Sequence, residues 1–327
     1  MAYLIRRLEF LVITLWAAVT VNFLLPRLMP GNPAQAVMSR IRGPVNPEIR
    51  HTMEVAFGLD THQSILAQYG QYLGDIAQGK FSVSISNFPT PVSQVILVAL
   101  PWTLGLIGIT TIISFALGTF AGMVSAWRRG RMADNVLPPV FIVMSALPYF
   151  WLGLLSIFVF SVSLRWFPLG FGSDVGSSGA LSWSYVGQVI SHAALPAITI
   201  VVTSIGGWIL TMRNNMIATL SEDYVKMARA KGLSPLRIMV QYAGRNAVLP
   251  NITGFAMSLG FVLSGALLTE IVFNYPGLGF VLYQAVTGED YPLMQAIFLI
   301  ITVAVLLAIV AADLVNIWLD PRTRGRG

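Results

Sequence analysis

Long apolar stretches alternate with short charged segments along the whole chain. A helix needs about 20 consecutive apolar residues to cross the hydrocarbon core of a membrane. Six stretches approach or exceed this length, and the predicted spans are about 8–25, 94–126, 136–164, 193–212, 247–269 and 291–319. The pattern therefore predicts an all-α integral membrane protein with about six transmembrane helices.

The composition of the 327-residue chain agrees with a membrane protein and excludes several kinds of chemistry. Hydrophobic residues make up 55% of it and charged residues 10%, whereas soluble domains carry about 25% charged residues. The chain has no cysteine, which excludes disulfides, thiolate metal sites and cysteine nucleophiles. His51, His62 and His192 lie far apart without metal-ligand spacing, so we interpret them as surface or loop residues. We predict no catalytic, cofactor or metal site.

The basic residues predict the orientation in the membrane. Fourteen Lys and Arg residues lie on one predicted side, in segments 6–7, 128–131, 213–245 and 322–326. The short loops on the opposite side contain one, Arg165, and the loop between the first two spans is too long for the charge rule to apply. Because basic loops stay in the cytoplasm, both termini are predicted to be cytoplasmic. The same asymmetry explains the net charge of +6 without a nucleic-acid partner.

The spans divide the chain into segments. These are a first transmembrane helix at 1–29, a long extracellular loop at 30–93, a core domain at 94–320 that includes a cytoplasmic loop at 213–246, and a basic cytoplasmic tail at 321–327. Helices are expected within the extracellular loop at 47–56 and 63–77. Arg6 and Arg7, with Ala34-Gln35-Ala36, also resemble a cleaved signal peptide. The first apolar stretch is long for a signal peptide, so we favour a retained helix.

Small residues and prolines within the spans favour close or kinked helix packing. They are Pro101, Pro148 and Pro196, and the small-residue pairs Gly118 with Gly122 and Gly260 with Ser264. Each proline removes one helical hydrogen bond. Together these residues predict a tightly packed bundle that contains kinked helices.

Acidic residues are scarce in the spans. Glu270 is expected at the outer end of the fifth span and Asp313 near the inner end of the sixth, where each can reach an interface or pair locally. Acids deep in a membrane are costly and usually functional, and this chain has none at a predicted midplane. That disfavours a proton-coupled transporter or channel. The chain also lacks a GxSxG motif and a Ser/His pair at matching depth, which disfavours an intramembrane protease.

The cytoplasmic loop at 213–246 has the strongest local signals. A helix is predicted from Ser221, with two acidic residues in its first turn, where they interact favourably with the helix dipole. Gly232 is placed to end this helix, and Ser234-Pro235 resembles the start of a second one. The candidate functional residues are Ser221, Glu222, Asp223, Tyr224, Val225, Met227, Ala228, Arg229, Ala230, Lys231, Gly232, Leu233, Ser234 and Pro235.

Two roles suit this helix–turn–helix unit. Its basic face can rest on anionic lipid headgroups, or the unit can dock into a partner protein on the cytoplasmic side. The local residues leave both roles open.

A resemblance to a known family favours docking. The run from Ala228 to Pro235, Ala-Arg-Ala-Lys-Gly-Leu-Ser-Pro, resembles the coupling loop of binding-protein-dependent ABC importers in its peptide-permease form. The family's general motif consists of EAA, then three residues, a glycine and nine further residues before I-x-LP. The chain departs from this motif. Lys226-Met227-Ala228 stands in place of EAA, and Pro250 follows Gly232 by 18 residues rather than 13. The peptide-type motif, which continues with Arg-Asn-Ala-Val-Leu-Pro up to Pro250, fits better.

Further matches to this family extend over essentially the whole chain. They are Pro30–Pro33 (with Asn where the family has Asp), Phe57–Asp60, Gln68-Tyr69, Tyr72-Leu73 and Thr269–Gly279. They are specific to the B-type permease of the dipeptide/oligopeptide/nickel group, which has a long first external loop.

The resemblance implies the type I permease fold of ABC importers, in the bacterial cytoplasmic (plasma) membrane, and import of di- or oligopeptides or a related small solute. It implies a second homologous permease subunit, two ATP-binding subunits that hold ATP and Mg²⁺, and an extracellular or periplasmic substrate-binding protein. This chain has no GxxxxGK[ST] motif, so ATP hydrolysis is expected in the partner subunits, coupled through the loop around Gly232. The alternative is a secondary transporter or channel subunit not driven by ATP. The sequence does not identify the residues of the substrate path.

Overall fold

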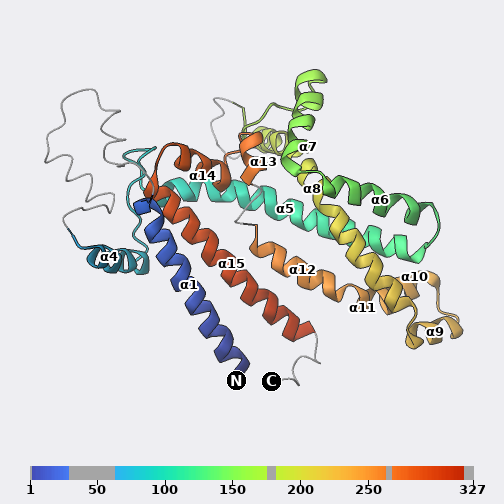
Figure 1. Cartoon of the computed structure of the whole chain (residues 1–327). Helices are drawn as coiled ribbons and strands as arrows, with labels where there is room; N and C mark the ends of the chain where they lie inside the picture. Colours follow the sequence, from blue (N-terminus) through green and yellow to red (C-terminus); the bar gives the residue numbers. More distant parts are fainter. Residues whose placement is uncertain (1, 29–62, 175–181, 263–266, 320–327) are drawn as a thin grey trace. The chain divides into compact units, whose positions relative to one another are not determined.

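The computed structural model describes residues 2–28, 63–174, 182–262 and 267–319, and these are predominantly helical (Figure 1). Among them, β-pairing is confined to one antiparallel bridge between Val83 and Pro91. The prediction of an all-α protein is confirmed for this part of the chain. The predictions that lie outside it concern the helix at 47–56, the Ala34-Gln35-Ala36 site, His51, His62, Ser264 and the basic tail.

The chain forms two compact units. The first contains residues up to Trp102 together with Pro276–Leu306, and the second contains Thr103–Tyr275 and the segment from Leu307 onward. Two long helices, α5 (Val92–Trp127) and α15 (Tyr291–Leu319), contribute to both units.

The first unit also contains α1 (Ala2–Leu28), α4 (Ile65–Ala77) and α14 (Leu278–Thr287). The predicted helix at 63–77 is α4, which begins after an N-cap, Ser64, whose hydroxyl accepts a hydrogen bond from the amide of Ala67. Phe23 of α1 is buried against Tyr69 and Tyr72 of α4, at ring-centroid distances of 5.0 and 5.5 Å. Burial raises the pKa of Tyr72 to about 12. Aromatic packing therefore fixes α4 on α1.

A buried carboxylate organises the start of α15. Asp290 is fully buried, and one of its oxygens accepts a hydrogen bond from the amide of Leu293 in the first turn of α15. The other oxygen accepts hydrogen bonds from the hydroxyl of Ser84 and the amide of Ser86. Asp290 thus caps a helix and holds the segment before α5 against it.

The second unit contains further helices that lie between α5 and α15 in the sequence. They are α6 (Met132–Ala146), α7 (Tyr149–Ser156), the π-helical η1 (Ile157–Ser163), α8 (Trp183–Leu220), α9 (Asp223–Ala230), α10 (Pro235–Arg237), the π-helical η2 (Ile238–Gly244), α11 (Arg245–Ala247), α12 (Leu249–Gly260) and α13 (Leu267–Val272). Helix α8 is the longest of them and packs against α6, α7 and α12.

Glycines allow α8 to approach its neighbours closely. A Cβ atom added to Gly122 of α5 would lie 2.5 Å from the carbonyl oxygen of Ile209, and Gly118 faces α8 in the same way. A Cβ on Gly206 of α8 would lie 2.4 Å from the carbonyl oxygen of Phe141 in α6. The predicted role of Gly118 and Gly122 in close helix packing is confirmed.

Several described helices can cross a membrane. Val92–Trp127, Trp183–Leu220 and Tyr291–Ala312 are each long and apolar enough, and a fourth crossing results if Met132–Ala146 and Tyr149–Ser163 are counted as one span bent by 95°. Glu9–Leu25 is a shorter apolar helix. The count of six spans and the cytoplasmic position of the termini stay predictions.

Two predicted spans are divided in the structure. The span at 136–164 is interrupted because Leu147 has an extended backbone and Pro148 has no amide hydrogen to continue the helix. The span at 247–269 contains the end of α12 at Gly260 and the start of α13 at Leu267.

Candidate functional site

The predicted coupling loop begins where α8 ends. Helix α8 continues to Leu220, and the hydroxyl of Ser221 donates a hydrogen bond back to the carbonyl of Ala218. Ser221 is therefore the C-cap of α8, and the predicted helix start at Ser221 is wrong. The next helix, α9, begins at Asp223 after Glu222 as its N-cap.

The turn after α9 has the geometry that its sequence predicts. Gly232 has a φ of +72°, in the left-handed region. Its amide donates to the carbonyl of Arg229, and the amide of Leu233 donates to the carbonyl of Ala228, which is the Schellman pattern of helix termination. Ser234 is then the N-cap of α10 and Pro235 its first residue. The helix–glycine–Ser-Pro prediction is confirmed as structure, whereas its coupling role stays a prediction.

One face of α9 is anchored in the protein. Val225 and Ala228 are buried in an apolar cluster that joins α9 to the ends of α5 and α8 and to η2. The buried members of the cluster are Ala126, Met212, Met216, Val225, Ala228, Ile238, Met239, Ala243 and Ala247. The cluster therefore packs α9 against α8 and η2.

The other face of this unit is exposed and includes apolar side chains. Tyr224 is 39% exposed, Met227 60% and Leu236 67%. Lys226 forms an exposed ion pair with Asp223 at 2.9 Å, and its hydrogen bond keeps the pKa of that carboxyl below its ordinary value. Exposed apolar side chains with a charged rim are typical of a protein-interaction surface.

Of the predicted loop residues, Val225 and Ala228 are buried, Leu233 is partly buried and the others are exposed. The exposed residues form the surface of the unit, and the two buried ones fix it to the transmembrane helices. The structure thus distinguishes buried residues that anchor the loop from exposed residues that a partner can reach, and the sequence prediction did not make this distinction.

A partly buried ion pair next to this loop was not predicted. Asp134 of α6 accepts hydrogen bonds from Nε and Nη2 of Arg213 in α8, and also from the hydroxyl of Ser125 and the amide of Gly130. The Asp134 side chain is 5% exposed and that of Arg213 24%. This cluster fixes the end of α8 against the turn between α5 and α6. Its sequence signal was weak, because its ionic partners are 79 residues apart.

The interpretation of His192 is wrong, and that of Glu270 is confirmed in part. His192 is buried in α8 rather than exposed, with Nδ1 2.6 Å from the carbonyl oxygen of Gly170 and Nε2 3.1 Å from a carboxylate oxygen of Asp174. Glu270 is fully buried rather than snorkelling to an interface, and it accepts a hydrogen bond of 2.8 Å from the hydroxyl of Thr103. Local pairing of Glu270 is confirmed. The side chain of Asp313 is not among those that the structure describes.

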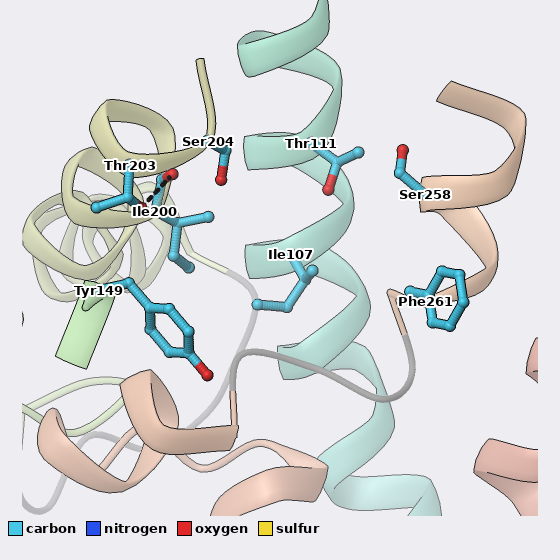
Figure 2. Close-up of a pocket in the computed structure, with 8 residues that line it drawn as sticks. All are labelled: Ile107, Thr111, Tyr149, Ile200, Thr203, Ser204, Ser258 and Phe261. Atoms are coloured by element: carbon cyan, nitrogen blue, oxygen red, sulfur yellow. Dashed lines mark hydrogen bonds between the residues drawn. The ribbon is translucent and has the colours of Figure 1, made fainter. Parts of the chain in front are cut away.

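A cavity of 240 Å³ lies among α5, α7, α8 and α12 in the second unit. Its lining residues are Ile107, Thr111, Tyr149, Ile200, Thr203, Ser204, Ser258 and Phe261. Figure 2 shows Thr111 between the lining residues of α8 on one side and those of the α12 segment on the other. The sequence did not identify these residues, because they come from four segments and form no local motif.

The long apolar helices make the chain a helical membrane protein, and comparison with known proteins gives its family. Residues 118–325 match the family described as "Binding-protein-dependent transport system inner membrane component". The chain belongs to this family and is a multi-pass protein of the bacterial inner membrane.

Its relatives extend the similarity to the whole chain. It is 32% identical to the di/tripeptide transport system permease protein DppB of Pseudomonas aeruginosa, over 99% of both chains. It is 32% identical to the oligopeptide transport system permease protein AppB of Bacillus subtilis, over 98% of both. It is 31% identical to the glutathione transport system permease protein GsiC of Escherichia coli, over 98% of both.

Proposed function

We propose that this chain is the permease subunit of an ATP-driven importer for di- or oligopeptides or a related small solute. The observation that carries the proposal is the similarity over nearly the full length to permeases named for di/tripeptides, oligopeptides and glutathione. A second homologous permease completes the translocation path. A substrate-binding protein delivers the peptide from outside.

Two ATP-binding subunits, holding ATP and Mg²⁺, supply the energy. They dock on the exposed face formed by Tyr224, Met227 and Leu236. The buried face of α9 then passes their closure to the membrane helices through Val225 and Ala228. The contrast between an exposed apolar face and an anchored one supports this route.

Reconstitution tests the proposal. The chain, the second permease and the ATPases are purified together from the membrane and placed in liposomes with the binding protein outside and ATP inside. Uptake of a labelled dipeptide or oligopeptide is expected to require ATP and every subunit. Uptake by this chain under a proton gradient without ATP would instead support a secondary transporter.

A further inference from the structure

Two walls of the membrane cavity present hydrogen-bond acceptors. The hydroxyl of Thr203 donates to carbonyls of its own helix α8, at 2.9 and 3.0 Å, and the hydroxyl of Ser258 donates to a carbonyl of α12 at 2.8 Å. Their hydrogens are therefore engaged within the helices. The oxygen lone pairs that remain can accept N–H groups of a ligand.

The rest of the lining is also uncharged. Tyr149, Thr111 and Ser204 add hydroxyl groups that can donate or accept hydrogen bonds. Ile107, Ile200 and Phe261 add apolar surface (Figure 2). None of the residues that line this cavity is acidic or basic. A main-chain amide with a small or apolar side chain matches this mixture, since it brings one donor and one acceptor beside an apolar group.

The size of the cavity limits what it holds at one time. Its 240 Å³ correspond to about eight water molecules at roughly 30 Å³ each. That space suits one or two residues of an extended peptide, so a longer peptide would pass through it in sections.

We propose that this cavity is a transit station that binds the main-chain amides of a peptide during import and does not select by the charge of its side chains. The inference rests on the proposed function and adds a substrate contact to it. A fixed charge in the lining would hold peptides of opposite charge and repel those of the same charge, whereas a neutral polar lining binds both weakly enough to release them. Selection by charge then belongs to the binding protein.

The absence of cysteine from the chain makes a direct test simple. Thr111→Cys introduces a single thiol into the lining of the station. After assembly of the complete transporter, the thiol is modified with an anionic or a cationic methanethiosulfonate. Uptake of Glu-Ala and Lys-Ala is compared with saturated binding protein and ATP. Ile113→Cys is the matched control, because residues two positions apart lie on nearly opposite faces of the same helix, and Ile113 is exposed and outside the lining.

We expect unmodified Thr111→Cys to transport both peptides at similar rates. The anionic adduct should slow Glu-Ala about tenfold relative to Lys-Ala, and the cationic adduct should do the reverse, because like charges repel strongly at short range in a medium of low dielectric constant. The Ile113→Cys control should show no such reversal. Equal effects of both adducts on both peptides, or failure of the thiol to react at rest and during turnover, would overturn the proposal.

A second pair of variants tests the acceptor role without adding charge. Thr203→Val keeps the shape of the side chain but removes the hydroxyl, and should lower the maximal uptake of Ala-Ala about threefold to tenfold. Thr287→Val is the control, because Thr287 makes the same hydrogen bonds to its own helix, in α14, and does not line the cavity. Equal uptake by the two variants would contradict the acceptor role. If unmodified transporter imports peptides while these tests fail, only the transit station is wrong; if it imports none with ATP, the proposed function itself fails.

Discussion

Arg213 in the C-terminal part of α8 and Asp134 in the first turn of α6 form a two-point ion pair. Both guanidinium nitrogens involved, Nε and Nη2, donate to the carboxylate. Helix α8 is about 57 Å long, which exceeds the roughly 30 Å of a bilayer core. Its end therefore needs fixation by protein contacts, and this ion pair supplies one close to the loop that leads to α9.

We predict that loss of one member of this pair is more harmful than loss of both. Asp134→Asn leaves the partly buried Arg213 without its counter-charge and should destabilise the protein by about 1–3 kcal/mol, because the guanidinium loses a charged hydrogen-bond partner. Asp134→Asn combined with Arg213→Met should recover part of that loss. The measurement is the thermal unfolding midpoint of the purified chain in detergent. Purely additive losses would show that the two residues act independently.

The glycines of α5 provide a comparison within one helix. Gly122→Ala places a Cβ 2.5 Å from the carbonyl oxygen of Ile209, so α5 and α8 must separate. Gly105→Ala and Gly108→Ala meet nothing within 4 Å in this chain, and alanine is the better helix former by about 0.5–1 kcal/mol.

We therefore predict that Gly122→Ala lowers the unfolding midpoint and the amount of protein in the membrane, and that the other two variants leave both unchanged or slightly higher. The three variants are compared by quantitative immunoblot and by thermal unfolding in detergent. Similar losses at all three positions would mean that flexibility of α5, rather than close packing on α8, requires glycine.

Local signals and long-range contacts explain which features could be predicted. Gly232 was predicted as a helix end because the rule depends only on neighbouring residues, and its φ of +72° agrees. The start of α9 was misplaced because serine favours the N-cap position, whereas Ser221 is the C-cap of the preceding helix α8 and Glu222 is the N-cap of α9. The full burial of Glu270 was not predicted, because its partner Thr103 lies 167 residues away in the sequence.

The membrane topology gives a further prediction. The basic residues place both termini in the cytoplasm and the segment around Val45 outside. After Gly327, green fluorescent protein should be fluorescent and alkaline phosphatase inactive. At Val45, alkaline phosphatase should be active and green fluorescent protein dark. Paired alkaline phosphatase and green fluorescent protein fusions measure both positions. Five predicted spans separate Val45 from Gly327, so finding both reporters on the same side of the membrane would contradict the six-helix prediction.

The last prediction concerns Gly232, where the backbone alone demands glycine. A Cβ at this position meets no atom of this chain within 4 Å, and φ is +72°. Gly232→Val should therefore cost about 1–2 kcal/mol through backbone strain and disturb the path from α9 to α10. Insertion depends on the long apolar helices rather than on this turn, so we expect near-normal amounts of protein in the membrane. We expect most ATP-dependent uptake to be lost and the ATPases to dissociate more easily in detergent.

Gly232→Asn is the matched control, because asparagine tolerates the left-handed conformation, and it should retain most of the uptake. Lys226→Gln with Arg229→Gln tests the role at a lipid surface. Normal uptake by Gly232→Val, together with loss in the charge variant, would show that the loop rests on anionic lipid rather than docking to an ATPase.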